Sequence, residues 1–237
     1  MAWARVQSKS DATTTTGSPT GTKTVTLGST PVSGNKILVL IAISAGATAS
    51  NTVSSVADGN SVALTQAWSK ANTNNCWTYL YFYDVPATPS AAITVTYAKQ
   101  VGTMENAVLV VEFSGLAPGS SLDGSAATIS GSATPSTTAG YTSTVANELL
   151  VSGFCDFGGP NNVSLSGWTL DPNSVNNNGS QDCVLAWRNS TGGAETSDTW
   201  TVGSGDQYAI GTVAFKLAAV AAKPPFGRQA VPRAAYR

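Results

Sequence analysis

One apolar pattern occurs twice in this chain, and it limits the fold more than any other feature. Residues 35–39 read Asn-Lys-Ile-Leu-Val, and residues 147–151 read Asn-Glu-Leu-Leu-Val. Similar segments follow each copy in the same order, at offsets that shrink from 112 (Asn35 and Asn147) to 102 (Phe113 and Phe215). We interpret residues 34–116 and 146–217 as two similar halves. Chance similarity between β-rich segments is the alternative.

Both halves consist of short segments rich in β-branched and aromatic residues, separated by Gly, Pro, Asn, Asp and Ser, which is the pattern of strands and turns. The turn at residues 58–60, Asp-Gly-Asn, predicts a hairpin between the strands on either side of it. No helix is expected, because Pro224 and Pro225 follow the one helix-like stretch. The predicted strands cover residues 3–7, 23–27, 37–43, 53–57, 62–68, 76–83, 93–97, 107–113, 122–129, 148–154, 163–170, 183–187, 199–202 and 208–217.

Five strands cannot close a barrel, and a small open sheet leaves one face unburied. We therefore expect the two halves to press together as one antiparallel β-sandwich of about ten or more strands with a common core. The low charged fraction of 11%, with 23 Gly, suits an all-β protein with uncharged polar outer faces. The predicted organisation is a strand and loop arm at 1–30, the sandwich at 31–217 and an extended arm at 218–237.

Three predicted strands are apolar on both faces, whereas a sandwich strand normally alternates apolar and polar residues. They are residues 37–43, 79–83 and 108–111. A further layer must cover them. This layer is either the N-terminal segment of the chain or another subunit, and the second possibility predicts a homo-oligomer.

Charge is distributed unevenly along the chain. The net charge is −1, which argues against nucleic-acid binding. Residues 37–216 contain four cations and twelve acids, whereas residues 1–36 and 217–237 are both basic. We expect an acidic body that faces outward. No secretory signal or apolar run of about 18 residues is present, so we expect no membrane span and assembly in the cytoplasm.

The chain contains no histidine, which removes the commonest general base and metal ligand. Paired carboxylates would remain for a glycosidase, but the candidates form no motif, and Glu112 is expected to point outward from its strand. We therefore predict no enzyme activity. The carboxylates considered are Glu105, Glu112, Asp156 and Asp182.

Metal, thiol and sugar sites are weakly indicated. Loops at 156–162 and 171–178 are rich in Asp and Asn, but they lack calcium-loop spacing, so we interpret them as solvated and predict no metal or cofactor. Cys76, Cys155 and Cys183 are too few and scattered for a zinc site and are expected to be buried thiols. Tryptophans could stack on a sugar if exposed, although core packing is their commoner use. The candidates are Trp68, Trp77, Trp168, Trp187 and Trp200.

Several motifs occur in the order found in a known family. They are Gly34-Asn35-x-x-Leu-Val, the Asp58-Gly-Asn turn, the aromatic strand at 79–83, Ile93-Thr-Val-Thr-Tyr, and Val110-Val-Glu-Phe-Ser-Gly-Leu followed by Leu122-Asp. Over residues 30–217 the chain resembles jelly-roll-like β-sandwich virion proteins of tailed bacteriophages. The resemblance implies a non-enzymatic minor tail or tail-tip protein in a virion assembled in the host cytoplasm. Alternatives are a capsid decoration protein or head fibre, and a carbohydrate-binding module for a host glycan.

The last fifteen residues are expected to anchor the protein to tail or capsid subunits. Three prolines exclude regular structure there, and four cations alternate with apolar side chains. A tail packed against its own body is the alternative. The predicted anchors are Lys223, Phe226, Arg228, Arg233, Tyr236 and Arg237.

Overall fold

In the computed structural model, every strand pair of the described residues is antiparallel, and none of these residues is helical. The predicted all-β class is therefore confirmed. The described residues are 2–16, 21–45, 52–72, 76–98, 103–132, 141–157, 163–176, 181–196, 198–202 and 207–219.

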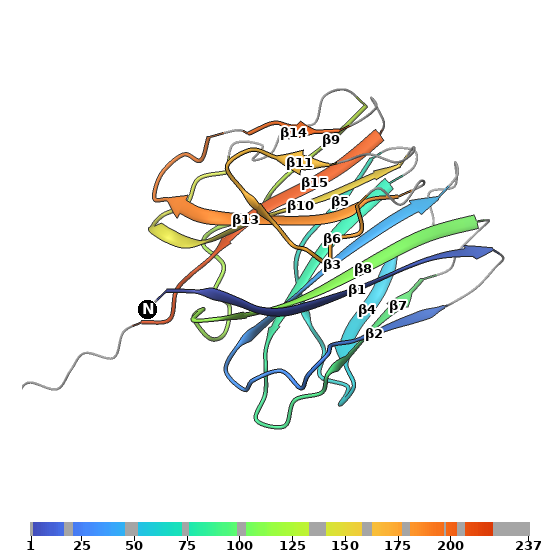
Figure 1. The fold of residues 1–237 in the computed structure, drawn as a ribbon, viewed down its shortest axis with the longest axis horizontal. Helices are drawn as coiled ribbons and strands as arrows, with labels where there is room; N and C mark the ends of the chain where they lie inside the picture. Colours follow the sequence, from blue (N-terminus) through green and yellow to red (C-terminus); the bar gives the residue numbers. More distant parts are fainter. Residues whose placement is uncertain are drawn as a thin grey trace, which may run out of the picture.

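Residues 4–114, called the first half from here on, form a five-stranded central sheet and a three-stranded outer sheet (Figure 1). The central sheet has the order β1 (Ala4–Thr16), β8 (Thr103–Ser114), β3 (Lys36–Ala45), β6 (Cys76–Asp84), β5 (Thr65–Ala71). The outer sheet has the order β2 (Thr22–Thr26), β7 (Ala92–Tyr97), β4 (Val53–Asp58).

Residues 127–215, called the second half from here on, form another five-stranded sheet and a small two-stranded one. The larger has the order β9 (Ala127–Gly131), β15 (Gln207–Phe215), β10 (Ala146–Phe157), β13 (Cys183–Thr191), β12 (Thr169–Leu170). The smaller pairs β11 (Ser164–Leu165) with β14 (Trp200–Thr201).

Strand order is the same in the two halves. Each strand of the central sheet has a counterpart at the same place in the second five-stranded sheet. The counterparts of β1, β8, β3, β6 and β5 are β9, β15, β10, β13 and β12, in that order. The pair β7 and β4 corresponds in the same way to β14 and β11. The two halves therefore repeat one topology, with β3 matched to β10 as the sequence pattern predicts.

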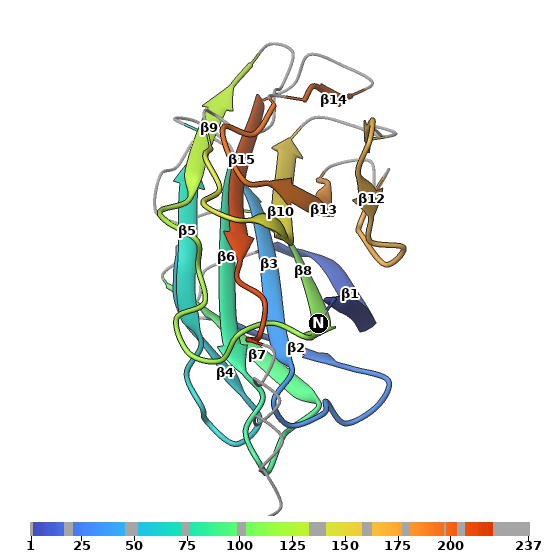
Figure 2. The ribbon, with the colours of Figure 1, turned by 90° about the vertical axis from the view of Figure 1, so that its left-hand side faces the viewer.

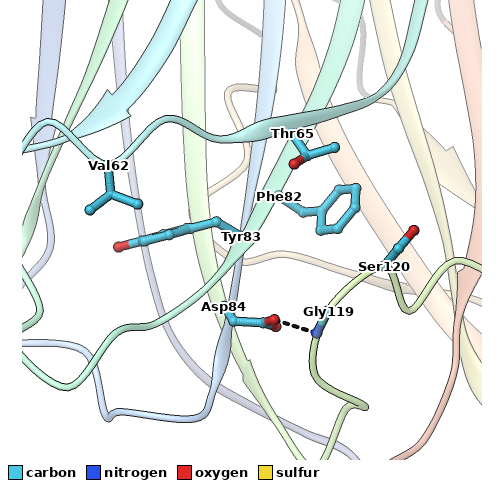
Figure 3. Close-up of a pocket in the computed structure, with 7 residues that line it drawn as sticks. All are labelled: Val62, Thr65, Phe82, Tyr83, Asp84, Gly119 and Ser120. Atoms are coloured by element: carbon cyan, nitrogen blue, oxygen red, sulfur yellow. Dashed lines mark hydrogen bonds between the residues drawn. The ribbon is translucent and has the colours of Figure 1, made fainter.

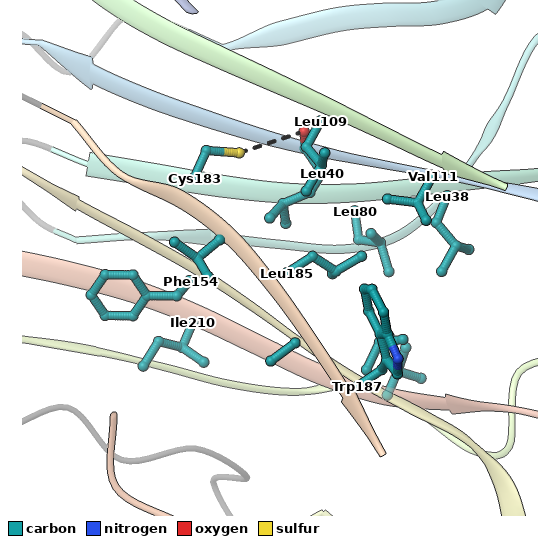
Figure 4. Packing of buried hydrophobic residues seen from close by; sticks show 14 of the residues in the cluster. Leu38, Leu40, Leu80, Leu109, Val111, Phe154, Cys183, Leu185, Trp187 and Ile210 are labelled. Carbon is teal, nitrogen blue, oxygen red and sulfur yellow. Dashed lines mark hydrogen bonds between the residues drawn. The ribbon is translucent and has the colours of Figure 1, made fainter. Parts of the chain in front are cut away.

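The two five-stranded sheets share an apolar interior. Side chains on one face of β3, including Leu38 and Leu40, meet Phe154 and Leu185 of the second half (Figure 4). Two aromatic contacts cross the same interface, and both are edge-to-face with ring centroids 5.4 Å apart, a favourable geometry. They join Phe82 to Phe215 and Phe113 to Trp187.

The opposite face of β3 is covered by the chain's own outer sheet. Val39 and Ile41 belong to a second cluster together with Val25 of β2 and Ile93 of β7. Figures 1 and 2 show this sheet on the side of the central sheet away from the second half. The layer that the apolar strands require is therefore intramolecular, and the N-terminal segment supplies only one of its three strands.

A tryptophan of the first half packs on two glycines of the second. Gly153 and Gly211 are directly opposite each other on β10 and β15. A Cβ atom at Gly211 would lie 2.3 Å from Cε2 of Trp68, and one at Gly153 would lie 2.4 Å from Cδ1 of Leu40. The absence of side chains at the two glycines thus leaves the space that the indole of Trp68 fills.

The predicted hairpin around residues 58–60 is wrong in its strand pairing. The turn itself forms, because Oδ1 of Asp58 accepts the N–H groups of Asn60 at 2.9 Å and Val62 at 2.8 Å. The strands that leave it separate after one bridge: β4 pairs with β7 in the outer sheet, and β5 pairs with β6 in the central sheet. The turn therefore connects two layers.

The predicted outward-facing acidic body is also wrong. Most acidic side chains of the described residues are buried, because loops and strand ends supply donors to them. The exposed surface of the described residues consequently carries few acidic side chains. The buried acids are Asp58, Glu112, Asp123, Glu148, Asp156, Asp171, Asp182 and Glu195.

Candidate functional site

The two ends of the described chain meet at Gly115. The N–H of Ala218 donates to the carbonyl of Gly115 at 3.0 Å. On the other side, a Cβ at Gly115 would lie 2.5 Å from the carbonyl oxygen of Ala2, and Gly115 has a φ of +78°, so glycine is required. Figure 1 shows the N-terminal residues beside the chain that follows β15. We call residues 2–5, 115–123 and 214–219 the terminal pole.

The loop at 115–123 is hydrogen-bonded to the end of β15 along its length. The N–H of Ala117 donates to the carbonyl of Lys216 at 2.8 Å, and the N–H of Lys216 donates to the carbonyl of Ser121 at 2.7 Å. Leu116 and Leu217 form a further bridge. The segment that leads into the C-terminal arm is therefore held firmly until residue 218.

An ion pair between a buried lysine and a half-buried aspartate fixes the middle of this loop. Lys36 is 1% exposed, and its Nζ donates to Asp84 and, at 3.3 Å, to the carbonyl of Gly119. It also lies 5.2 Å from the centroid of Phe82. Asp84 in turn accepts the N–H of Gly119. Strands β3 and β6 thereby hold the loop through charged side chains.

A pocket of about 370 Å³ opens beside this ion pair. Figure 3 shows Phe82 of β6 on the side of the loop, near Ser120, whereas the next residue, Tyr83, points away from the loop toward Val62. The hydroxyl of Tyr83 has no hydrogen-bond partner among the described residues. Burial, and then the charges of Asp58 and Glu112, raise the pKa of Tyr83 to about 12, so its hydroxyl stays protonated at neutral pH. The lining residues are Val62, Thr65, Phe82, Tyr83, Asp84, Gly119 and Ser120.

Two buried carboxyl groups are paired at the far end of the loop. The side chains of Asp123 and Glu148 are hydrogen-bonded to each other, and both residues are at most 3% exposed. Asp123 also accepts the backbone N–H and the hydroxyl of Thr144, and Nζ of Lys216 lies 4.0 Å from it. The pair connects the loop to the first residues of β10.

The pKa values of these two carboxyl groups move in opposite directions. Burial, and then the hydrogen bond and charge of Asp123, raise the pKa of Glu148 to about 7. Burial also acts on Asp123, but the two bonds from Thr144, the bond with Glu148 and the charge of Lys216 outweigh it and lower its pKa. The pair therefore shares one proton near neutral pH. Because the groups are in direct contact, they cannot flank a sugar bond, which needs carboxyls at least about 5 Å apart.

The sequence did not identify this pair, and the carboxylates that it did suggest lie elsewhere. Glu112 was predicted to point outward, which is wrong, because it is fully buried. It accepts the N–H of Val32 at 2.8 Å and the side-chain amides of Asn35 at 2.6 Å and Gln7 at 2.7 Å, so it holds the turn before β3. The alignment of Glu148 with Lys36, both at the start of matching strands, was the one available signal for the pair.

The remaining suggested carboxylates are at strand ends. Glu105 is half-buried and accepts the hydroxyl of Ser44 at 3.3 Å. Asp156 accepts the N–H of Asp182 at 3.1 Å. Among the described residues no three metal-ligating side chains gather.

Three of the four N-terminal cations, Arg5, Lys23 and Lys36, are engaged within the body. Arg5 pairs with Asp171 at 2.7 Å, and Lys23 lies 3.6 Å from Asp11. Asp171, from the second Asp-rich loop, also accepts the hydroxyl of Ser8 at 2.7 Å. The N-terminal segment therefore belongs to the body as β1 and β2, and residues 158–162 and 177–178 of the two loops lie outside the described part.

All five tryptophans considered for sugar stacking are at most 8% exposed, so none offers a ring face to a ligand. Trp168 donates to Asp198 at 2.8 Å and lies 4.7 Å from the guanidinium of Arg188. The three cysteines are free and buried, and burial raises the pKa of the Cys155 and Cys183 thiols.

The six predicted anchors, residues 223, 226, 228, 233, 236 and 237, lie outside the described residues. Where the structure describes the chain, it contains no helix long and apolar enough to cross a membrane. Comparisons with models of known protein families and with curated proteins find no match.

Proposed function

We propose that this protein is a non-enzymatic structural component of a tailed-phage virion, most specifically a minor tail or tail-tip protein, anchored by its C-terminal arm. We also infer a jelly-roll-like arrangement, which is supported by the strand orders β1-β8-β3-β6 and β2-β7-β4 of the first half, although β5 lies beside β6 and not beside β4. In this proposal the partners are tail or capsid subunits and further copies of the chain.

One observation carries the proposal: the chain leaves its body at a rigid pole. Ala218 and Ala2 both lie against Gly115, and the 115–123 loop between the halves is fixed there by the half-buried Lys36–Asp84 ion pair and the buried Asp123–Glu148 pair. A fixed exit orients the basic arm toward one neighbour, which reduces the entropy lost on binding. The cations of the arm then favour the correct orientation on acidic subunits.

A decoration protein or head fibre would use the same pole and differs only in the subunit to which it binds. The tryptophans considered for sugar binding are buried, so no observation supports the alternative of a carbohydrate-binding module.

Deleting residues 220–237 is expected to leave the body folded and to remove the protein from particles. The truncation retains β15 and the bonds of residues 214–218, so its melting temperature should match that of the full chain. The amount in gradient-purified particles, measured by immunoblot, should fall by about tenfold or more, since each 1.4 kcal/mol of lost binding is a factor of ten.

Substitutions that remove the arm's charge but keep its length test whether incorporation depends on the cations. Replacing Arg228, Arg233 and Arg237 with Ala should reduce incorporation, whereas Lys70→Ala in β5 should not. If the truncated protein enters particles at the level of the full chain, the anchoring role is refuted.

A further inference from the structure

We propose that two copies of the chain pair through β1, antiparallel, with Ser10 of one copy opposite Ser10 of the other. The pairing joins the two central sheets into one continuous sheet around a two-fold axis. This inference deepens the proposed function, which includes further copies of the chain as partners, and rests on it only for the role of the dimer in a particle.

Strand β1 is an edge of the central sheet. Of the described strands only β8 pairs with it, and Figure 2 shows the sheet in the order β5, β6, β3, β8, β1. It has 13 residues, against 7 in β5 and at most 6 in the other described edge strands. Its one irregularity lies between Arg5 and Gln7, so its pleat is regular beyond them. A long, regular edge strand is a template on which another strand can pair.

The hydrogen bonds of the neighbouring strands show which backbone groups of β1 face outward. The N–H of Val85, just after β6, donates to the carbonyl of Asn35, just before β3, at 2.9 Å. Hydrogen-bonded positions alternate along an antiparallel strand, so counting across β3 and β8 leaves the even-numbered residues of β1, from Ser8 onward, with their N–H and C=O groups at the free edge. The carbonyl of Ser8 accepts the side-chain amide of Asn173 at 3.0 Å, as an outward-facing carbonyl can.

The sequence around Ser10 is complementary to itself. Since Ser10 has its N–H and C=O groups at the free edge, it can form a hydrogen-bonded pair with Ser10 of the second copy. Antiparallel pairing then places Lys9 directly opposite Asp11 of the second copy, and Asp11 opposite Lys9. These are non-hydrogen-bonded positions, where opposite side chains come closest. Lys9 is exposed, and the side chain of Asp11 is 47% exposed.

The two charged side chains lie on one face of the sheet. Asp11 is 3.6 Å from Lys23 of β2, so it points to the side of the outer sheet, and Lys9, two residues away, shares that side. A carboxylate offers about four acceptor positions, so Asp11 can accept a second lysine beside Lys23. Opposite charges placed directly across from each other stabilise a strand pair.

The same charges select this register. If the two-fold axis moved by one residue, it would place Lys9 opposite Lys9 or Asp11 opposite Asp11. Like charges directly opposite each other destabilise a strand pair. Lysine on an edge strand commonly prevents pairing, but in the register around Ser10 each lysine meets an aspartate.

The test measures the mass of the purified full chain by sedimentation as its concentration is raised. The natural chain is expected to dimerise. Lys9→Asp and Asp11→Lys should each weaken dimerisation by about tenfold or more, because two attractive pairs become repulsive. Lys70→Asp, on the opposite edge of the sheet, should have no effect. A natural chain that stays monomeric at every concentration would overturn the proposal, as would single variants that dimerise normally.

A mixture of the two single variants tests the register. A Lys9→Asp chain and an Asp11→Lys chain carry opposite charges at both facing positions, so together they should form heterodimers with about the natural affinity. If each variant keeps the natural melting temperature and the mixture still contains only monomers, the register around Ser10 is wrong.

Ser10→Pro tests the backbone pairing. Proline is tolerated where the N–H of an edge strand faces solvent, so the bonds to β8 should remain. The change removes the N–H at the centre of the proposed pair, and dimers should be lost. Dimers that persist in Ser10→Pro would refute pairing through β1.

The outcome is separable from that of the proposed function. Sedimentation requires no virion partner, and removal of the C-terminal arm leaves β1 unchanged. A monomeric chain whose truncation still abolishes incorporation would refute only the pairing, whereas a dimer that enters particles without its arm would refute only the anchoring.

Discussion

Replacing Trp68 with Ala is expected to lower the free energy of unfolding by about 4 kcal/mol, the usual cost of removing a large aromatic side chain from a core. Trp68 belongs to the first half but packs on Gly153 and Gly211 of the second. The cavity would therefore open between the two five-stranded sheets, where both halves contribute to it. Urea unfolding followed by circular dichroism measures the change.

The glycines give this prediction its controls. Gly211→Ala should cost about 1 to 3 kcal/mol in the natural chain, because its Cβ would lie 2.3 Å from the indole. In the Trp68→Ala background the same change should be neutral or stabilising. Gly28→Ala, which meets nothing within 4 Å, should have little effect. If the two changes at residues 68 and 211 are simply additive, the indole does not pack on this glycine pair.

Glu148→Gln is expected to flatten the dependence of stability on pH. Burial and the neighbouring Asp123 raise the pKa of Glu148 to about 7 in the folded protein, from an ordinary value of 4.5. The folded state therefore keeps a proton that the unfolded state releases, and stability falls as the pH rises from about 4.5 through 7, by about 2 to 3 kcal/mol. A glutamine donates permanently to Asp123 and cannot ionise, so this loss should disappear and the variant should be the more stable protein at pH 8.

Unfolding measured at intervals between pH 4 and pH 8 tests this expectation. The chain has no histidine, so no histidine titration contributes to the change of stability in this pH range. Glu105→Gln, at a half-buried carboxylate on β8, is the matched control and should leave the slope in place. A natural protein whose stability is constant over this range would show that the carboxyl pair holds no extra proton.

Strand identity was predictable because it depends on local pattern. The segments that became β3, β6, β8, β10, β13 and β15 stand out as apolar or aromatic runs, and the two halves align through them. The need for a layer over β3 was also visible in its two apolar faces. The alternation of apolar and polar residues along a strand does not show which other segment covers its apolar face. The sequence therefore could not identify β2, β7 and β4 as the strands that cover β3.

Contacts between residues that are far apart in the sequence could not be predicted from local sequence pattern. Asp58 forms the turn that its sequence predicts, but whether β5 returns beside β4 or crosses to β6 depends on the packing of the whole half. Asp123 and Glu148 are 25 positions apart and meet only because the 115–123 loop runs along β15. The burial of Glu112 could not be predicted because its donors come from distant parts of the chain, β1 and the turn before β3.

Chemical cross-linking of intact particles tests the central claim, that the terminal pole faces the neighbouring subunits, most directly. Lys216 is exposed at this pole, and Lys223 follows it in the arm. Lys70 lies opposite Thr78, six residues along β6 from Asp84, and is thus about 20 Å from the pole. An amine-reactive reagent should join Lys216 and Lys223 to other virion proteins and leave Lys70 unlinked to them. Cross-links to other virion proteins from Lys70, with none from Lys216 or Lys223, would contradict it.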